Sequence, residues 1–339
     1  MFQNDDDIET VAKVWHLFFG IFGALLNGFL VFLAVCKSPQ IIRLYSTLII
    51  NFAVTDLFAC LLDMFIGIRL LPSPNEATMT YILNGYCKHF GLTTCTIGLS
   101  LFIHTLTHSL WSLFISFVYR YFILFHTGIS MKQILLILFF FYMPSFIQAA
   151  TYWTNFVDRD SILPIAERIY PEYDFRNQTG LLTGITDLFS VSALYALLHM
   201  TLPVTPVYII IFILRQRINK TLMKSRSSMS KETKTVHSQL LKALTCQSVI
   251  PVSAWIAVWV YIAMQFGLLH GKFFEYMIFS TVLFMPVLSP ITYLLFVRPY
   301  KNVCLRLFCR KSSGVIHDKS RTRFYTQHDY STIPAGRKF

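Results

Sequence analysis

The hydrophobic positions of this chain fall into seven long runs separated by short polar segments. Each run supplies the roughly 20 apolar residues that a helix needs to cross a hydrocarbon core about 30 Å thick. The pattern therefore predicts an all-α membrane protein, a bundle of seven transmembrane helices forming one domain. The expected helices cover residues 14–36, 45–68, 97–123, 134–153, 191–213, 243–267 and 276–297.

Lysine and arginine lie mostly in every second connection, which predicts the orientation. The segments on one side of the runs hold 22 of the 29 Lys and Arg residues, and the other side holds seven. Short cytoplasmic loops retain such residues. We therefore expect an extracellular N-terminus (1–13), a membrane domain (14–297) and a cytoplasmic C-terminus. After the last run we expect an amphipathic juxtamembrane helix (298–310) and a polar tail (311–339).

Composition supports a membrane location and accounts for the charge. Hydrophobic residues make up 55% of the chain and charged residues 14%, which a soluble domain could not solvate. The formal net charge of +12 comes mainly from residues at the membrane edges, where anionic lipid headgroups attract them. The lipid membrane is therefore an expected partner, and no nucleic-acid partner is needed to explain the charge.

Polar side chains within the runs are the candidate functional residues, because a charge at membrane depth costs at least about 2.5–3.5 kcal/mol. Asp56 and Asp63 are seven residues apart in the second run, so they share one helix face, with Asp63 about 10 Å further out. This face should turn into the bundle. An unpaired Asp63 would be a ligand-binding group in a cavity open to the outside. A hydrogen bond or ion pair to a neighbouring helix is the alternative.

The third run carries a polar stripe that can receive this face. Its members recur every three or four residues and so lie on one side of a helix: Thr105, Ser109, Ser112, Ser116 and Arg120. Such hydroxyl groups can also bond to their own helix or join neighbouring helices. Arg120 ends the stripe at the cytoplasmic edge, where its side chain can extend toward the headgroups without a buried partner.

Prolines predict bends in the last three runs. Pro286 and Pro290 in the seventh run remove backbone donors, so the helix should kink and the freed carbonyl groups need polar neighbours or water. Pro203 and Pro206 in the fifth run and Pro251 in the sixth predict further bends.

Cys87 and Cys95 lie at the outer end of the third run. They can form a disulfide only if the backbone between them is not a continuous helix, since eight helical residues would separate them by about 12 Å. Two free thiols are the alternative. The outer loop at 154–190 has no cysteine, so it cannot be bridged to the third helix.

Further residues are candidates for covalent modification. Asn177 begins a glycosylation sequon in the outer loop. Asn219 begins a second sequon in a cytoplasmic loop, where we expect no glycan. Cys304 and Cys309 lie beside the juxtamembrane helix and are candidates for palmitoylation.

A bundle of seven membrane helices occurs in several classes of protein, which the residues can separate. A retinal protein is excluded, because residues 276–297 contain no lysine for a Schiff base. A membrane-embedded metal hydrolase could use His104 and His108, spaced i and i+4, with Asp56 or Asp63. Histidines that contact neighbouring helices are the simpler interpretation, so we expect no metal site and no cofactor. A transporter fits poorly, because no internal repeat is evident, the number of spans is odd and only two carboxylates lie deep. A ligand-gated channel of seven helices is a further alternative, and the topology discriminates it.

Several motifs resemble a known family. The segments Gly23-x-x-x-Asn27, Asn51 to Leu57, Tyr119-Arg120-Tyr121 and Ser289-Pro290-x-x-Tyr293 resemble those of a variant rhodopsin-like G-protein-coupled receptor. Others resemble the nematode serpentine chemoreceptors of class delta: Cys87-Lys88-x-Phe90-Gly91, His108-Ser109-Leu110, Gln265-Phe266-Gly267, Phe274-Glu275-Tyr276 and Phe296-Val297-Arg298-Pro299-Tyr300. The resemblance covers nearly the whole membrane domain.

The resemblance implies roles for particular residues. It implies a polar core network of Asn27, Asp56, Ser109, Ser289 and Pro290, and G-protein contacts by Arg120 with Tyr119, Tyr121 and Tyr293. The chain also departs from the usual motifs. Tyr119 replaces the acid that pairs with the arginine, Ser289 replaces an asparagine, and the sixth run has no Cys-Trp-x-Pro motif. Because of these departures, the resemblance does not imply three features of the wider family. These are an ion pair that restrains Arg120, a sodium site at Asp56 and a tryptophan switch in the sixth run.

The function that these observations favour is that of a receptor without enzymatic activity. We expect it to bind an unknown small chemical from the outside, with Asp63, His104 and His108 as candidate ligand contacts. The resemblance implies that it activates a heterotrimeric G protein. It also implies a plasma-membrane location, in a sensory neuron or its cilium.

Overall fold

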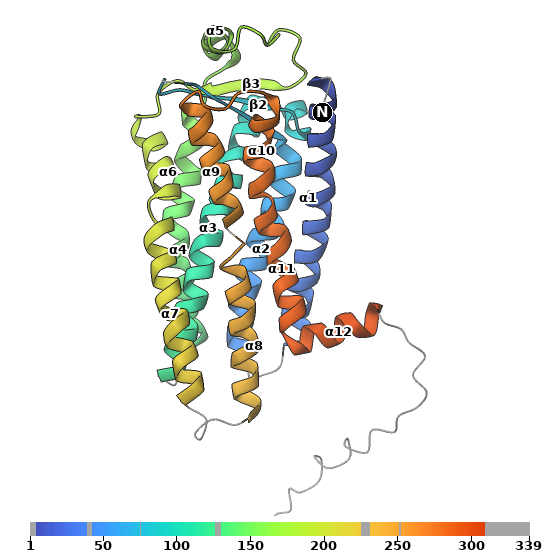
Figure 1. Ribbon diagram of the computed structural model, residues 1–339, viewed down its shortest axis with the longest axis vertical. Helices are drawn as coiled ribbons and strands as arrows, with labels where there is room; N and C mark the ends of the chain where they lie inside the picture. Colours follow the sequence, from blue (N-terminus) through green and yellow to red (C-terminus); the bar gives the residue numbers. More distant parts are fainter. Residues whose placement is uncertain are drawn as a thin grey trace, which may run out of the picture.

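A computed structural model describes residues 5–38, 43–74, 76–125, 130–224, 231–250 and 252–308. Its helices run along one long axis and form a bundle, with a small sheet across one end (Figure 1). The charge pattern predicts that this end is extracellular, and we call it the outer end. The expected tail (311–339) lies outside the described residues, as does Cys309 at the end of the expected juxtamembrane helix.

Each of the first four predicted spans is one continuous helix. Their bounds are α1 (Asp5–Cys36), α2 (Arg43–Ile66), α3 (Leu92–Phe125) and α4 (Met131–Tyr152). The start of α4 is fixed by a capping box, in which the side chain of Ser130 accepts from the backbone N–H of Gln133 and the Gln133 side chain accepts in return.

Each of the last three spans is a pair of helices, and proline explains the interruptions. The pairs are α6 (Val191–Thr201) with α7 (Val204–Lys224), α8 (Lys231–Gln247) with α9 (Val252–Gln265), and α10 (Lys272–Val282) with α11 (Phe284–Phe296). Pro203 separates the first pair, and Pro286 lies in the first turn of α11, so the helices are interrupted at these two prolines. At Pro290 the expected kink does not interrupt the helix, because α11 continues to Phe296. Pro251, between α8 and α9, lies outside the described residues.

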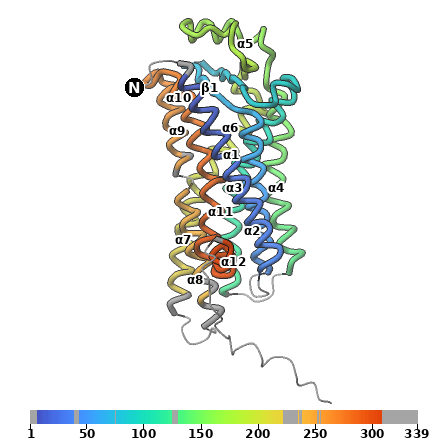
Figure 2. Tube along the Cα trace, turned by 90° about the vertical axis from the view of Figure 1, so that its right-hand side faces the viewer, coloured from blue at the N-terminus to red at the C-terminus, as the bar shows by residue number. Residues whose placement is uncertain are grey.

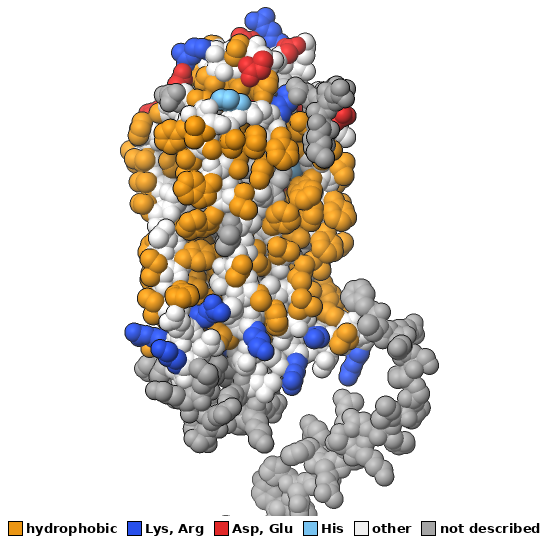
Figure 3. Space-filling view, in the orientation of Figure 1, with side chains coloured by type: hydrophobic (Ala, Val, Ile, Leu, Met, Phe, Trp, Pro, Cys, Tyr) orange, Lys and Arg blue, Asp and Glu red, His pale blue; other side chains and the backbone are white. Residues whose placement is uncertain are grey.

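Within the described ranges, six helical segments are long and apolar enough to cross a membrane, and Trp255–Gln265 of α9 is a shorter apolar helix. Because α9 continues the column of α8 (Figure 1), the bundle has the seven columns that the sequence predicts. On the face seen in Figure 3, hydrophobic side chains cover most of the length of the bundle, and the acidic side chains lie toward the end that carries the sheet. After α11, α12 (Arg298–Phe308) turns across the cytoplasmic end.

An antiparallel sheet covers the outer end, and the sequence did not predict it. Its strands lie in the order β1 (Ile68–Pro72), β2 (Met79–Leu83) and β3 (Leu181–Ile185). In the register, Leu70 faces Tyr81 and Tyr81 faces Thr183. Both β1 and β2 are buried along their whole length.

The two faces of the sheet pack against different elements. Leu70 and Tyr81 join a hydrophobic cluster with Phe102 of α3 and Phe279 of α10. On the opposite face, Leu71, Ile82 and Leu182 pack with Ile162 and Ala166. The last two belong to α5 (Arg159–Ile169), which lies above the sheet in both views (Figures 1 and 2). The sheet and α5 therefore cover the end at which we expect an open cavity, and that cavity stays a prediction.

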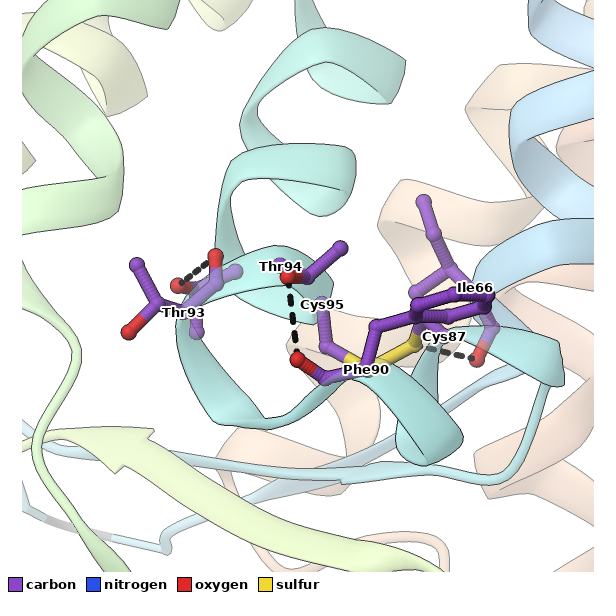
Figure 4. The surroundings of a disulfide bond; sticks show 7 residues. Ile66, Cys87, Phe90, Thr93, Thr94 and Cys95 are labelled. Carbon is purple, nitrogen blue, oxygen red and sulfur yellow. Dashed lines mark hydrogen bonds between the residues drawn. A yellow bond between two sulfur atoms is a disulfide. The ribbon is translucent and has the colours of Figure 1, made fainter.

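Cys87 and Cys95 form a disulfide at the outer end (Figure 4), with their Cα atoms 5.1 Å apart. The backbone between them is not a continuous helix. A short 3-10 helix, η2 (Tyr86–Phe90), ends at Gly91, whose φ of 95° lies in the region that favours glycine, and α3 begins at the next residue. The chain therefore meets the condition that the sequence set for this disulfide.

Candidate functional site

The polar faces of α2 and α3 meet inside the bundle, as their spacing predicts. Ser109 Oγ donates to Asp56 Oδ1 at 2.8 Å, and Asn51 Nδ2 donates to Ser112 Oγ at 2.8 Å. The whole α3 stripe, Thr105, Ser109, Ser112, Ser116 and Arg120, is buried. Ser116 bonds instead to the backbone of its own helix, at Ser112 O. Ser109 and Ser112 of the stripe thus join α3 to α2 by hydrogen bonds.

Asn27 of α1 donates a hydrogen bond to the backbone of the seventh span. Its Nδ2 donates to the carbonyl oxygen of Pro286 at 2.8 Å and to that of Gly23 at 2.9 Å. In a regular helix the Pro286 oxygen would accept from the N–H of residue 290, but Pro290 has none. The prediction that a freed carbonyl would find a polar neighbour is confirmed here.

A small cavity with a mostly apolar lining lies beside Asp56, deep in the bundle. Its volume is about 20 Å³, enough for one water molecule. Asp56, Ser109, Gln247 and Ser289 contribute its polar lining, and Gln247 Nε2 donates to Ser289 Oγ at 3.1 Å. Asp56 Oδ2 and Gln247 Oε1 have no hydrogen-bond partner in the described part of the chain. Water or a hard cation would suit these oxygen atoms.

Arg120 lies buried over an aromatic ring at the cytoplasmic end. Its Cζ is 4.0 Å from the centroid of the Tyr45 ring, and only 2% of the residue is exposed. Tyr119 stacks on the same ring at 5.8 Å, and the hydroxyl oxygens of Tyr45 and Tyr293 are 3.5 Å apart. The expectation that Arg120 extends to the headgroups is wrong, because the Tyr45 ring offers a closer cation–π partner.

Tyr121 lies apart from this group. It packs on a hydrophobic cluster that includes Phe117 of α3 and Ile218 of α7. The structure therefore brings Tyr119, Arg120 and Tyr293 together around Tyr45 and places Tyr121 on the α7 side of α3.

Asp63 is paired with a side chain of a neighbouring helix, which is the alternative to a ligand-binding role. Its Oδ2 lies 2.8 Å from Nδ1 of His16 in α1, and His16 Nε2 lies 3.0 Å from Ser280 Oγ in α10. Asp63 is 0% exposed and His16 6% exposed. An unpaired carboxylate in an open cavity is therefore not what the structure contains. The carboxylate instead joins α1, α2 and α10 near the outer end.

His104 and His108 stack on one face of α3, with ring centroids 5.9 Å apart. The Tyr142 ring of α4 meets both edge on, at 4.8 and 5.1 Å. Across the described ranges, no group of three or more His, Cys, Asp or Glu side chains is arranged to hold a metal ion. Asp56 and Asp63 are engaged elsewhere, so neither completes the hydrolase site that we considered.

A buried ion pair fastens the sheet to the bundle. Arg69 Nη2 of β1 lies 2.6 Å from Glu275 Oε2 of α10, and both side chains are at most 1% exposed. Tyr173 donates to Glu275 Oε1 at 2.7 Å, and its ring lies 5.0 Å from the Arg69 Cζ. Burial lowers the pKa of Arg69, but Glu275, Tyr276 and Tyr173 together raise it, and the pKa lies above its usual value. Burial and the same carboxylate raise the pKa of Tyr173, which keeps it a neutral donor.

The candidate modification sites are placed as follows. Asn177 is exposed in the outer loop, with its Nδ2 2.5 Å from Asp174 Oδ2. Asn219 is exposed near the cytoplasmic end of α7. Cys304 is half-buried in α12 and packs on the cytoplasmic hydrophobic cluster. Glycosylation and palmitoylation at these positions stay predictions.

Several residues of these networks were missed from the sequence. Gln247 is a polar residue inside the sixth run and Glu275 an acid beside the seventh, so both carried a signal. His16 and Arg69 lie at run ends, where polar residues are common. Tyr45 carried no signal, since a tyrosine at a membrane edge is ordinary.

The geometry defines a seven-helix receptor fold of the rhodopsin type. The crystal structure of squid rhodopsin is similar to this chain with a TM-score of 0.58 and 15% sequence identity, over 92% of this chain and 90% of that one. At this identity the likeness shows the fold alone. It agrees with the predicted bundle of seven membrane helices.

Sequence comparison defines the family within that class. Residues 12–306 match the family described as serpentine type 7TM GPCR chemoreceptor Srd. Serpentine receptor class delta-19 of Caenorhabditis elegans is 50% identical over 87% of both chains. Class delta-18 of the same organism is 50% identical over 91% of this chain and 95% of its own. The chain therefore belongs to the class delta serpentine chemoreceptor family, a family of multi-pass membrane receptors and not of enzymes, which confirms the resemblance.

Proposed function

We propose that this chain is a chemosensory receptor that binds a small chemical from outside the cell and activates a heterotrimeric G protein. Its place is the plasma membrane of a sensory neuron or its cilium. Family membership supports a receptor. The observation that carries the coupling step is Arg120, a cation held inside the bundle by Tyr45 at the predicted cytoplasmic end.

The surroundings of Arg120 suggest how coupling would occur. The Arg120 guanidinium stacks on the Tyr45 ring of α2, a cation–π contact that a small relative movement of the helices can break. Tyr45 and Tyr293 link its site to α11, and Gln247 with Ser289 links α11 to α8. A shift of α8 or α11 would therefore uncover the guanidinium for the G protein. A ligand would drive that shift by binding the uncovered state more tightly.

A screen of diverse chemicals on cells that express the full chain with a G-protein readout tests this proposal. At least one chemical should give a response that untransfected cells lack. The Arg120→Ala variant should reach the surface and give no response to that chemical. Ion currents that persist without any G protein would instead support a ligand-gated channel.

A further inference from the structure

A second polar cluster lies between α3, α4 and α6, and His108 Nε2 at 3.4 Å from the Asn51 amide connects it to the contact between α2 and α3. His199 Nδ1 of α6 lies 2.8 Å from Gln148 Oε1 of α4, and its ring centroid lies 6.3 Å from that of Trp111 in α3. Ser145 is about one turn from Gln148 in α4. His104 of α3 lies against the backbone of Ser145. We call this cluster the histidine seam: His104, His108, Trp111, Ser145, Gln148 and His199.

Several buried polar atoms of the histidine seam have no hydrogen-bond partner in the part of the chain that the structure describes, which is costly for a contact between helices that contains no water. The following buried atoms have no hydrogen-bond partner among the described residues: His108 Nδ1, Trp111 Nε1, Ser145 Oγ, Gln148 Nε2 and His199 Nε2. Ser145 and Gln148 are 0% exposed and His108 is 1% exposed. Each such group costs about 1–3 kcal/mol when it is left without a partner. A polar occupant between the three helices would meet this demand.

The unmet groups define the chemistry of that occupant. Because Gln148 Oε1 accepts from His199 Nδ1, the hydrogen-bond network assigns the ring hydrogen to Nδ1 and leaves His199 Nε2 an acceptor. Gln148 Nε2 and Trp111 Nε1 can only donate, and the Ser145 hydroxyl can do either. A hydroxyl group matches both kinds of position, and a carbonyl oxygen matches the donors. No Asp, Glu, Lys or Arg belongs to the seam, so a charged ligand would be unpaired at membrane depth.

The position of the seam favours the same class of ligand. The sheet and α5 cover the outer end of the bundle (Figure 1). Tyr142, which contacts His104 and His108, is 37% exposed on the lipid-facing side of α4. A molecule that reaches the seam past Tyr142 must first enter the hydrocarbon core, which neutral molecules do far more readily than ions.

We propose that the histidine seam is the ligand site of this receptor and that it takes a small neutral molecule bearing a hydroxyl or carbonyl oxygen. The molecule arrives through the bilayer and satisfies Gln148, Ser145 and His199. This inference rests on the proposed receptor function but is tested without a G protein.

Thermal unfolding of the purified full chain in lipid nanodiscs tests the site. The probes are short-chain alcohols and methyl ketones, compared with alkanes, carboxylates and amines of the same chain length. A bound alcohol or ketone should raise Tm by about 2 °C or more, and the other probes should not. Equal shifts from alkanes or ions, or no shift from any alcohol or ketone, would overturn the proposal.

Two variants locate the binding. Gln148→Leu should abolish the alcohol or ketone shift, because it removes the Nε2 donor. It should also lower the unliganded Tm, because His199 Nδ1 loses its hydrogen bond to Gln148 Oε1. Ser145→Ala gives a second test should that variant fail to fold. Thr151→Val is the control, since Thr151 bonds only to its own helix, and it should keep the shift. A shift that survives in both seam variants places the ligand elsewhere. Arg120→Ala should keep the shift, so failure of G-protein coupling alone would leave this site standing.

Discussion

Asn27 of α1 supplies the hydrogen bond that Pro290 cannot give to the Pro286 carbonyl oxygen, at 2.8 Å across the bundle. The joint between α10 and α11 is thereby held from two sides, because Ser289 accepts from Gln247 of α8 on another face of α11. A proline-weakened helix that is fastened to two neighbours has defined positions to move between.

Asn27→Leu should lower the free energy of unfolding by about 1–2 kcal/mol, because the Pro286 carbonyl loses its partner in a medium without water. Thermal unfolding in detergent measures the effect. Asn219→Leu is the matched control, since Asn219 is exposed near the end of α7. Equal Tm values for the two variants would mean that the Asn27 bond contributes nothing.

The ion pair under the sheet should behave as a buried pair. Glu275→Leu strands the Arg69 charge and should destabilise the protein by about 3–5 kcal/mol, seen as a sharp fall in surface level and Tm. Replacing both Arg69 and Glu275 by leucine should recover most of the loss, since no charge is then left unpaired.

The exposed pair Arg168 and Glu76 provides the control for that experiment. Their side chains are 65% and 32% exposed, so Arg168→Leu should change stability by less than about 1 kcal/mol. If the double leucine variant at Arg69 and Glu275 has no higher Tm than Glu275→Leu, the cost does not come from an unpaired Arg69 charge.

The disulfide should matter for the outer end alone. Replacing Cys87 and Cys95 together by serine opens a short loop and should cost about 2.5 kcal/mol by the chain-entropy estimate. Thiol labelling before and after reduction, with Tm, checks both the bond and its effect. Cys36→Ser is the control, because Cys36 is free and exposed. Full labelling of Cys87 without a reductant would show that the bond does not form.

The sequence predicted the helices well because the bilayer imposes one solution on a long apolar run. It also predicted which faces of α2 and α3 meet, since Asp56 and the α3 stripe have no acceptable lipid-facing position. It missed the sheet, because β1 and β2 are buried on both faces and so lack the apolar and polar alternation that marks a strand. The cross-bundle partners of Asp63 and Arg120 depend on helix rotation and packing, which periodicity alone does not fix.

The orientation is open to a direct test. A tag after Phe339 should be reachable by antibody only after permeabilisation, because the basic segments stay in the cytoplasm. Asn177→Gln should remove any glycan, and Asn219→Gln should change nothing. An antibody that reaches the C-terminal tag on intact cells would reverse the bundle and favour a channel.

The central claim is that Arg120 transmits ligand binding to a G protein. For the first chemical that activates the wild-type chain, nucleotide exchange on the G protein should be measured in membranes carrying Arg120→Ala, with Arg217→Ala, an exposed arginine of α7, as the matched control. We predict that Arg120→Ala keeps its surface level and its ligand-induced Tm shift but loses nucleotide exchange by at least tenfold, about 1.4 kcal/mol, while the control keeps it. Unchanged nucleotide exchange in Arg120→Ala would contradict the account.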